Sequence, residues 1–357
     1  MRILFLLLLL LPWTAFSQAS QIKPDQEIVF YPAFGHRGAD GKSWELEIHG
    51  CVFEPERRRV ALALLREALS LRHVRLTPSQ DATFTERARF FMVDHERGKS
   101  IVVRLGERRF VLEKSHPNGH FAGVIRLSDS ESPLLRTNTL AISAVLPAND
   151  SRRFTGELHL LEETGLTVIS DIDDTIKLTG VQDRKTLLRN TFLEPYKPVP
   201  GMPEVYRAWA QGAGAQFCYV SASPWQLFSP LSQFGRSNGY PAGVFFLKDF
   251  RWKDQSFFGL FQRPEKYKPA IIEPLLQRFP NRRFVLVGDS GERDPEIYGA
   301  LARRYPRQVS RILIRDLTGE PALAPRYQKA FRNLPPDRWK LFREPAEIVN
   351  AVPWLLD

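Results

Sequence analysis

Beyond residue 165 the sequence alternates short, continuous apolar runs with segments of helical periodicity, and this alternation limits the possible folds more than any other feature. The apolar runs are Leu166–Ser170, Phe217–Val220, Val244–Leu247, Phe284–Val287 and Ile312–Ile314. Uninterrupted runs of this kind are typical of parallel strands that are buried on both faces. Helices are predicted between them at Pro203–Gln211, Pro224–Asn238, Pro269–Arg278 and Pro295–Arg304. The pattern predicts an α/β domain over residues 165–357, with a doubly wound parallel sheet.

The preceding stretch, residues 22–160, is β-rich and irregular. Candidate strands are Glu27–Phe30, Ser43–Val52, Phe90–Asp94, Ser100–Arg104, Arg109–Glu113, Phe121–Leu127, Thr139–Val145 and Glu157–Glu162, with one helical stretch at Pro55–Leu71. Strands at this spacing predict a small sandwich or barrel. A length of 357 residues suits two domains, and we expect the boundary between them near 147–166.

Residues 1–19 have the layout of a secretory signal peptide. Arg2 precedes the apolar run Ile3–Leu11, and Pro12 and small residues follow it. The run is shorter than the roughly 20 residues that a membrane-spanning helix needs. An uncleaved N-terminal anchor is the alternative. We therefore expect an exported protein, periplasmic or secreted, that is soluble or peripheral to the membrane. The low number of cysteines, two, favours a periplasm over a disulfide-rich secreted scaffold.

The formal charge of +10 lies mostly in the α/β half. Residues 171–357 contain 28 Lys and Arg against 20 Asp and Glu, whereas residues 1–170 are nearly balanced. An excess of this sign favours anionic partners, which include nucleic acid, a membrane surface and phosphorylated substrates. Charge alone does not choose among them.

Polar residues follow the apolar runs, and in an open α/β sheet ligands bind beyond the carboxyl ends of the strands. The candidates brought to this edge are Asp171, Asp173, Ser221, Asp289 and Asp294, with Lys266 or Lys268 at the start of a helix. Ser221 and Asp294 also have a simpler interpretation, because each lies just ahead of a predicted helix that it could cap. The order of all these residues along the chain, however, favours a catalytic role over helix capping.

The residue types indicate which chemistry. Period-two alternation places Asp171 and Asp173 on the same side of an extended segment, where two close carboxylates attract a divalent cation. Hard oxygen ligands suit Mg²⁺. A carboxylate can attack phosphorus while its neighbour serves as general acid and then base. A lysine and a serine hydroxyl supply the positive charge and hydrogen bond that phosphoryl transfer requires.

The order D-x-D-x-T, strand-end Ser, Lys and G-D-x₄-D resembles the motifs of the haloacid-dehalogenase-like superfamily of phosphatases. The longer strings Asp171–Lys177 with Thr179, Tyr219–Trp225 and Gly288–Tyr298 resemble the catalytic domain of the actin-patch-associated phosphatidate phosphatase family. That resemblance covers about residues 165–320. It implies a Rossmann-like fold with a minimal cap, because no large insertion separates the motifs.

The resemblance also implies roles for the site residues. Asp171 would be the nucleophile, Asp173 the acid and base, Ser221 a ligand of the phosphoryl oxygen, and Lys268 a cation that steadies both. Asp289 and Asp294 would complete a Mg²⁺ site with Asp171 and the backbone carbonyl of Asp173. Two departures stand out. Tyr267 precedes the lysine where the family has His, which leaves Lys266 as a competing candidate. The family members act inside cells, whereas we expect this chain to be exported.

The function expected from the resemblance is a Mg²⁺-dependent phosphatidate phosphatase that forms an aspartyl-phosphate and releases diacylglycerol and phosphate. One alternative keeps the mechanism but acts on a nucleotide, nucleic-acid end, sugar or protein phosphate. A second is a binding protein with a vestigial site. Aromatic and basic residues between Phe250 and Arg263 suit either an anionic membrane surface or single-stranded nucleic acid. The resemblance favours the membrane.

Overall fold

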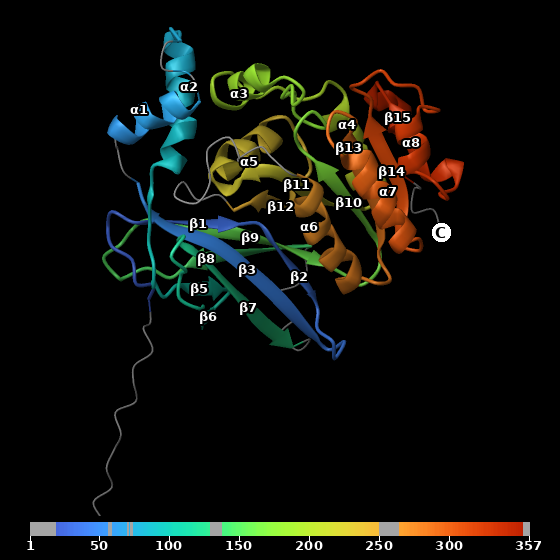
Figure 1. The fold of residues 1–357 in the computed structure, drawn as a ribbon. Helices are drawn as coiled ribbons and strands as arrows, with labels where there is room; N and C mark the ends of the chain where they lie inside the picture. The colour runs from blue at the N-terminus through green and yellow to red at the C-terminus, as the bar shows by residue number, and fades with distance from the viewer. Residues whose placement is uncertain are drawn as a thin grey trace, which may run out of the picture.

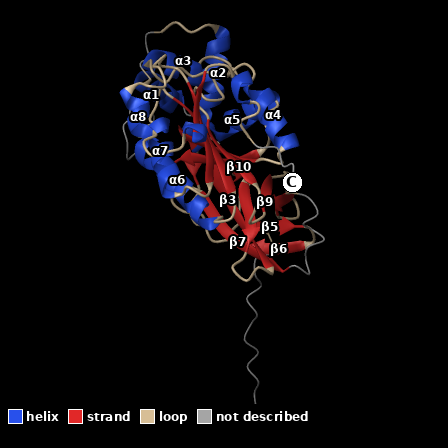
Figure 2. Cartoon of the chain, turned by 90° about the vertical axis from the view of Figure 1, so that its right-hand side faces the viewer, coloured by secondary structure: helices blue, strands red, loops and turns tan. Residues whose placement is uncertain are grey.

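The computed structural model describes residues 19–55, 59–69, 71, 74–128, 138–249 and 264–352. Its strands form two sheets, one before residue 162 and one after residue 165. In Figure 1 the first sheet lies below the second, and Figure 2 shows most helices gathered around the upper half of the molecule. The predicted signal peptide falls outside the described residues except for Ala19, and so do residues 250–263.

The first sheet is mixed. It contains β1 Glu27–Tyr31, β2 Ala33–Arg37, β3 Ser43–Glu54, β4 Asp94–His95, β5 Val102–Leu105, β6 Arg108–Val111, β7 His120–Ser128, β8 Thr139–Ala144 and β9 Thr155–Leu161. The strand order is β1-β3-β2-β9-β8-β5-β6, and β4 and β7 also pair with β3. Only β2 and β9 run parallel among these pairs. One face carries alternate apolar residues of β3, such as Leu46 and Ile48, into a buried cluster of its own.

The second sheet is entirely parallel and has the order β12-β11-β10-β13-β14-β15. Its strands are β10 Leu166–Asp171, β11 Gln216–Pro224, β12 Gly243–Lys248, β13 Arg283–Asp289, β14 Val309–Arg315 and β15 Trp339–Phe342. The principal helices are α3 Arg184–Phe192, α4 Met202–Gly212, α5 Phe228–Ser237, α6 Pro264–Arg278, α7 Asp294–Arg304 and α8 Pro325–Ala330. The predicted α/β arrangement with a parallel sheet is confirmed.

Helices cover both faces of the parallel sheet. Val168 of β10 points into a cluster with Tyr206 of α4 and Leu231 of α5. The next residue, Ile169, points the other way into a cluster with Ile272 of α6 and Leu301 of α7. Because alternate residues of a strand face opposite sides, two-sided burial explains why this strand is apolar without interruption. The carboxyl end of the sheet is left for polar residues.

The two sheets are joined by aromatic packing. The ring of Tyr31 in β1 lies 4.2 Å from that of Trp225 and 5.0 Å from that of Phe228. Helix α2 Pro78–Ala88, against which α1 Arg59–Ala68 packs, also reaches the α/β half, where Arg87 donates to the carbonyl of Thr191 at 2.6 Å. Trp225 lies only four residues beyond Ser221, so the first sheet supports the strand end that carries this site residue.

Several sequence predictions differ from the structure. Of the segment predicted as a strand at Phe90–Asp94, only Asp94 lies in a strand, β4, whereas Phe90 and Phe91 belong to the 3₁₀ turn Arg89–Phe91 that continues α2. The helix predicted at Pro224–Asn238 is shorter, because β11 extends to Pro224 and a 3₁₀ turn precedes α5. The elements β2, β15, α2, α3 and α8 were not predicted. Among the described residues, no helix combines the length and apolar character needed to cross a membrane.

Candidate active site

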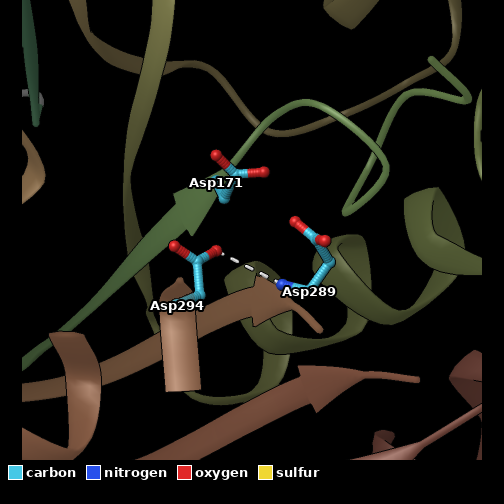
Figure 3. Close-up of side chains that lie close together, drawn as sticks. All are labelled: Asp171, Asp289 and Asp294. Atoms are coloured by element: carbon cyan, nitrogen blue, oxygen red, sulfur yellow. Dashed lines mark hydrogen bonds between the residues drawn. The ribbon is translucent and has the colours of Figure 1, made fainter. Parts of the chain in front are cut away.

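Three carboxylates converge at the carboxyl end of the parallel sheet. One oxygen each from Asp171, Asp289 and Asp294 lies within 4.8 Å of the others. Figure 3 shows the three side chains close together. Asp171 ends β10, Asp289 ends β13, and Asp294 begins α7. Because β10 and β13 are adjacent and parallel, their last residues meet at one edge. All three side chains are buried.

A buried lysine lies against the same carboxylates. The Nζ atom of Lys268 is 2.8 Å from Asp171 Oδ1, 2.5 Å from Asp294 Oδ1 and 3.3 Å from Glu292 Oε2. Lys268 is on α6, and its side chain is fully buried. Burial opposes the charged ammonium, but the surrounding carboxylates outweigh it and raise the pKa of Lys268 well above its usual value. The lysine is therefore a fixed cation of the site.

A single ammonium does not satisfy this acidic cluster. Oδ2 of Asp171 and Oδ2 of Asp289 are both buried without a hydrogen-bond partner among the described residues. Burial, opposed by Lys268, raises the pKa of Asp171 well above its usual range. Burial and then the charge of Asp294 raise the pKa of Asp289 in the same way. Two unpartnered buried carboxylate oxygens beside a third buried carboxylate fit a hard divalent cation.

The carboxylate of Asp173, two residues beyond the end of β10, is not one of the three in this cluster and is held by donors of its own. Its Oδ1 accepts a hydrogen bond from Thr179 Oγ1 at 2.8 Å and lies 2.8 Å from Lys177 Nζ. Its Oδ2 accepts from Ser221 Oγ at 2.8 Å and from Ser223 Oγ at 3.1 Å. Burial raises the pKa of Asp173, but the Lys177 ammonium and these hydrogen bonds outweigh it and lower the pKa to about 2. The carboxylate is ionised in this arrangement.

The segment after β10 is held by Asp174, which adopts the left-handed region at φ 58°. Its carboxylate accepts backbone hydrogen bonds from Thr179, Gly180 and Val181 at 2.6–2.7 Å. Arg315 donates to the backbone carbonyl of Asp174 at 2.6 Å. This turn places the residues that contact Asp173.

A glycine allows the close approach of α7 to β13. A Cβ atom on Gly288 would lie 2.1 Å from Asp294 Oδ2, which is far below contact distance. Asp294 Oδ2 also accepts a hydrogen bond from the backbone N–H of Asp289 at 3.3 Å. Gly288 therefore lets Asp294 reach the cluster rather than remain a helix cap, and the N-cap position is taken by Arg293.

The sequence singled out most of these residues. Alternation places Asp171 beside Asp173, and the family resemblance places Asp171 with Asp289 and Asp294. The structure brings Asp171, Asp289 and Asp294 together, and the Asp173 carboxylate is not part of that cluster. Of the two candidate lysines, Lys268 contacts the cluster, and the side chain of Lys266 lies outside the described part of the chain.

Sequence reasoning gave no role to three further residues of the site. They are Lys177, Ser223 and Glu292. Ser223 had a readable signal, because it lies two residues after Ser221 on a strand and shares its face. The contacts of Lys177 and Glu292 arise in irregular segments, where spacing gives no such signal.

Residues 166–316 match the family model described as "Phosphatidate phosphatase APP1, catalytic domain". The chain is 37% identical over 172 residues to "Phosphatidate phosphatase APP1" of Saccharomyces cerevisiae, a match that covers 47% of this chain and 29% of that protein. It is 28% identical over 194 residues to an uncharacterized protein of Schizosaccharomyces pombe, covering 52% and 31%. The chain thus spans about a third of the length of these relatives.

Among solved structures, a β-glucuronidase of Parabacteroides merdae overlays with a TM-score of 0.25 at 9% identity, covering 82% of this chain and 34% of that one. A TM-score this low does not indicate a shared fold.

Proposed function

We propose that this chain, whose residues 166–316 match the phosphatidate phosphatase APP1 catalytic-domain family, is a phosphoric monoester hydrolase acting on phosphatidate. The observation that carries the proposal is the buried cluster of Asp171, Asp289 and Asp294 against Lys268, which lies within the matched residues. The products would be diacylglycerol and inorganic phosphate.

In the first chemical step, a carboxylate oxygen of Asp171 attacks the phosphorus and the bond from phosphorus to the ester oxygen breaks. The phosphoryl group becomes an aspartyl-phosphate, and the departing alkoxide takes a proton from Asp173. The negative charge of the bound phosphate keeps Asp173 protonated for this step, in place of the ion found without substrate. In the second step, water attacks the aspartyl-phosphate and gives a proton to Asp173, while the bond to Asp171 breaks. The sum is one ester and one water converted to one alcohol and one phosphate.

Two further residues stabilise charge in these steps. Lys268 lies 2.8 Å from Asp171 and supplies positive charge where the phosphoryl group becomes attached. Ser221 lies at the end of the adjacent strand β11 and can donate its hydroxyl to a phosphoryl oxygen. Both groups are buried, and this strengthens their electrostatic effect.

The metal we propose is Mg²⁺, held by Asp171, Asp289 and Asp294 with the backbone carbonyl of Asp173. The unpartnered oxygens of Asp171 and Asp289 support a hard cation at this position. When bound, the ion would neutralise phosphate charge and allow the anionic nucleophile and substrate to approach.

Substrate choice separates the competing functions. A soluble nucleotide, nucleic-acid end, sugar or protein phosphate would use the same residues, and the family match favours the lipid. Phosphate release should be measured on phosphatidate vesicles and on soluble phosphomonoesters, with Mg²⁺ and with chelator. Preference for vesicles supports the proposal, and preference for a soluble ester contradicts the lipid assignment. Turnover of neither by the unmodified chain would support a binding protein with a vestigial site.

The architecture fits a haloacid-dehalogenase-like catalytic domain at 165–357, preceded by a β-rich domain at 22–160. We include in the proposal that residues 1–19 direct export and that the protein acts peripherally at an anionic membrane. The positive charge of residues 171–357 supports such a contact. Nucleic acid is the less favoured anionic partner, because the matched family is named for a lipid phosphatase.

A further inference from the structure

The carboxylate of Asp173 has its full complement of hydrogen-bond donors. A carboxylate offers about four lone-pair positions. Thr179 and Lys177 occupy Oδ1, and Ser221 and Ser223 occupy Oδ2. If Asp173 is to reach a substrate, one of these four donors must therefore give way.

The donors at the two oxygens differ in their surroundings. All four donors are buried, but Lys177 and Thr179 belong to the turn that Asp174 holds, whereas Ser221 and Ser223 lie near the end of strand β11. The Nζ of Lys177 donates to Thr179 Oγ1 at 2.5 Å and lies 4.8 Å from the centre of the Tyr196 ring. The Oδ1 oxygen is therefore held by a packed group of donors.

The backbone of Lys177 is held as firmly as its side chain. Its N–H donates to the carbonyl of Ile172 at 3.0 Å, and its carbonyl accepts from the N–H of Asp174 at 2.7 Å. Isolated β-bridges link Lys177 to Asp173 and to Pro198. A buried ammonium fixed in this way is costly unless it is paired, and its carboxylate partner is Asp173.

We propose that Lys177 is a positioning residue that, with Thr179, anchors Oδ1 of Asp173, so that Oδ2 passes the proton to the leaving group. Ser221 turns from Oδ2 to the phosphoryl oxygen when substrate binds, which frees a position on Oδ2 for the ester oxygen. The bond from phosphorus to that oxygen breaks as the proton moves from Oδ2 to it. The inference rests on the proposed function and adds to it the residue that orients the acid.

The test uses the dependence of this proton transfer on the leaving group. The alkoxide of diacylglycerol needs a proton as it departs, whereas 2,4-dinitrophenolate departs without one. In Lys177→Met, the ratio of kcat/KM on phosphatidate vesicles to kcat/KM on 2,4-dinitrophenyl phosphate should fall about 100-fold, because kcat/KM does not include the later hydrolysis of the aspartyl-phosphate that both esters share. In Thr179→Val it should fall about 10-fold. Both rates come from one preparation, so the ratio does not depend on the folded fraction.

The control is Lys185→Met, which removes an exposed lysine of α3 and should leave the ratio unchanged. Equal losses on both esters in Lys177→Met would show a purely structural role and overturn the inference, as would an unchanged ratio. Turnover of neither ester by the unmodified chain would contradict the proposed function itself.

Discussion

The ammonium of Lys268 lies 2.8 Å from Asp171 Oδ1 although both side chains are almost completely buried. Lys268 reaches this position from α6, on the opposite side of the sheet from α4 and α5. The contact joins a helix that begins after residue 263 to the end of β10. Through this contact, Lys268 provides a fixed positive charge at the carboxyl end of the sheet.

Replacing Lys268 with Met should lower kcat on phosphatidate at least 100-fold, because the phosphoryl group loses its fixed cation. Removing one partner of a buried charge pair should also lower the free energy of unfolding by about 3 kcal/mol. Steady-state kinetics and urea denaturation check the two effects. Lys329→Met, which removes an exposed lysine of α8, is the matched control. Full activity of Lys268→Met would exclude the role assigned here.

A divalent cation should raise the thermal unfolding temperature, because an ion that binds the native carboxylates stabilises the folded state by mass action. Differential scanning fluorimetry with Mg²⁺ and with chelator measures this. Asp289→Asn should abolish the shift, whereas Asp183→Asn, which changes an exposed helix cap, should keep it. An equal shift in both variants would place the cation elsewhere on the chain.

Acid should remove a stabilising contribution from Asp173. Its folded-state pKa is lowered to about 2, so this contribution is complete above the unfolded pKa near 4 and is lost as pH falls through about 2. The difference corresponds to about 2 kcal/mol. The gap in unfolding free energy between the unmodified chain and Asp173→Asn should narrow by this amount between pH 5 and pH 2. A gap independent of pH would mean that Asp173 is not held as an ion.

Gly288→Ala should destabilise the protein by more than about 2 kcal/mol, because its Cβ would collide with Asp294 Oδ2. The cation-induced rise in unfolding temperature should disappear with it. Gly235 in α5 offers the matched control, since a Cβ there meets no atom within 4 Å. Gly235→Ala should be neutral or stabilising by up to about 1 kcal/mol. Similar losses in the two variants would argue against the close approach described here.

Most strands and helices of the α/β half could be predicted from the sequence, because each leaves a pattern within its own short segment. Strands buried on both faces, such as Leu166–Asp171, are continuous apolar runs, and the residues after them must lie at one edge. Helix α2 was also readable in principle, because Thr77 and Gln80 form a capping box at its start. The short edge strand Trp339–Phe342 carries only a weak signal, since its burial depends on packing against β14.

The side chains that contact Asp173 could not be predicted from the spacing of residues in the sequence. Asp173 was expected beside Asp171, but the chain leaves the strand at Asp171 and turns. Where the Asp173 carboxylate points is decided by Lys177 in that turn and by Ser221 on a strand about fifty residues later. Contacts of this kind depend on tertiary geometry, which period-two alternation does not encode.

In the proposed reaction, Asp171 attacks the phosphorus of phosphatidate. Its most direct test is phosphate release from phosphatidate vesicles with Mg²⁺, comparing the intact chain with Asp171→Asn, with circular dichroism to confirm folding of both. We expect steady turnover by the intact chain, its loss on chelation, and no measurable turnover by the folded variant. Turnover by Asp171→Asn at the rate of the unmodified chain would contradict the account.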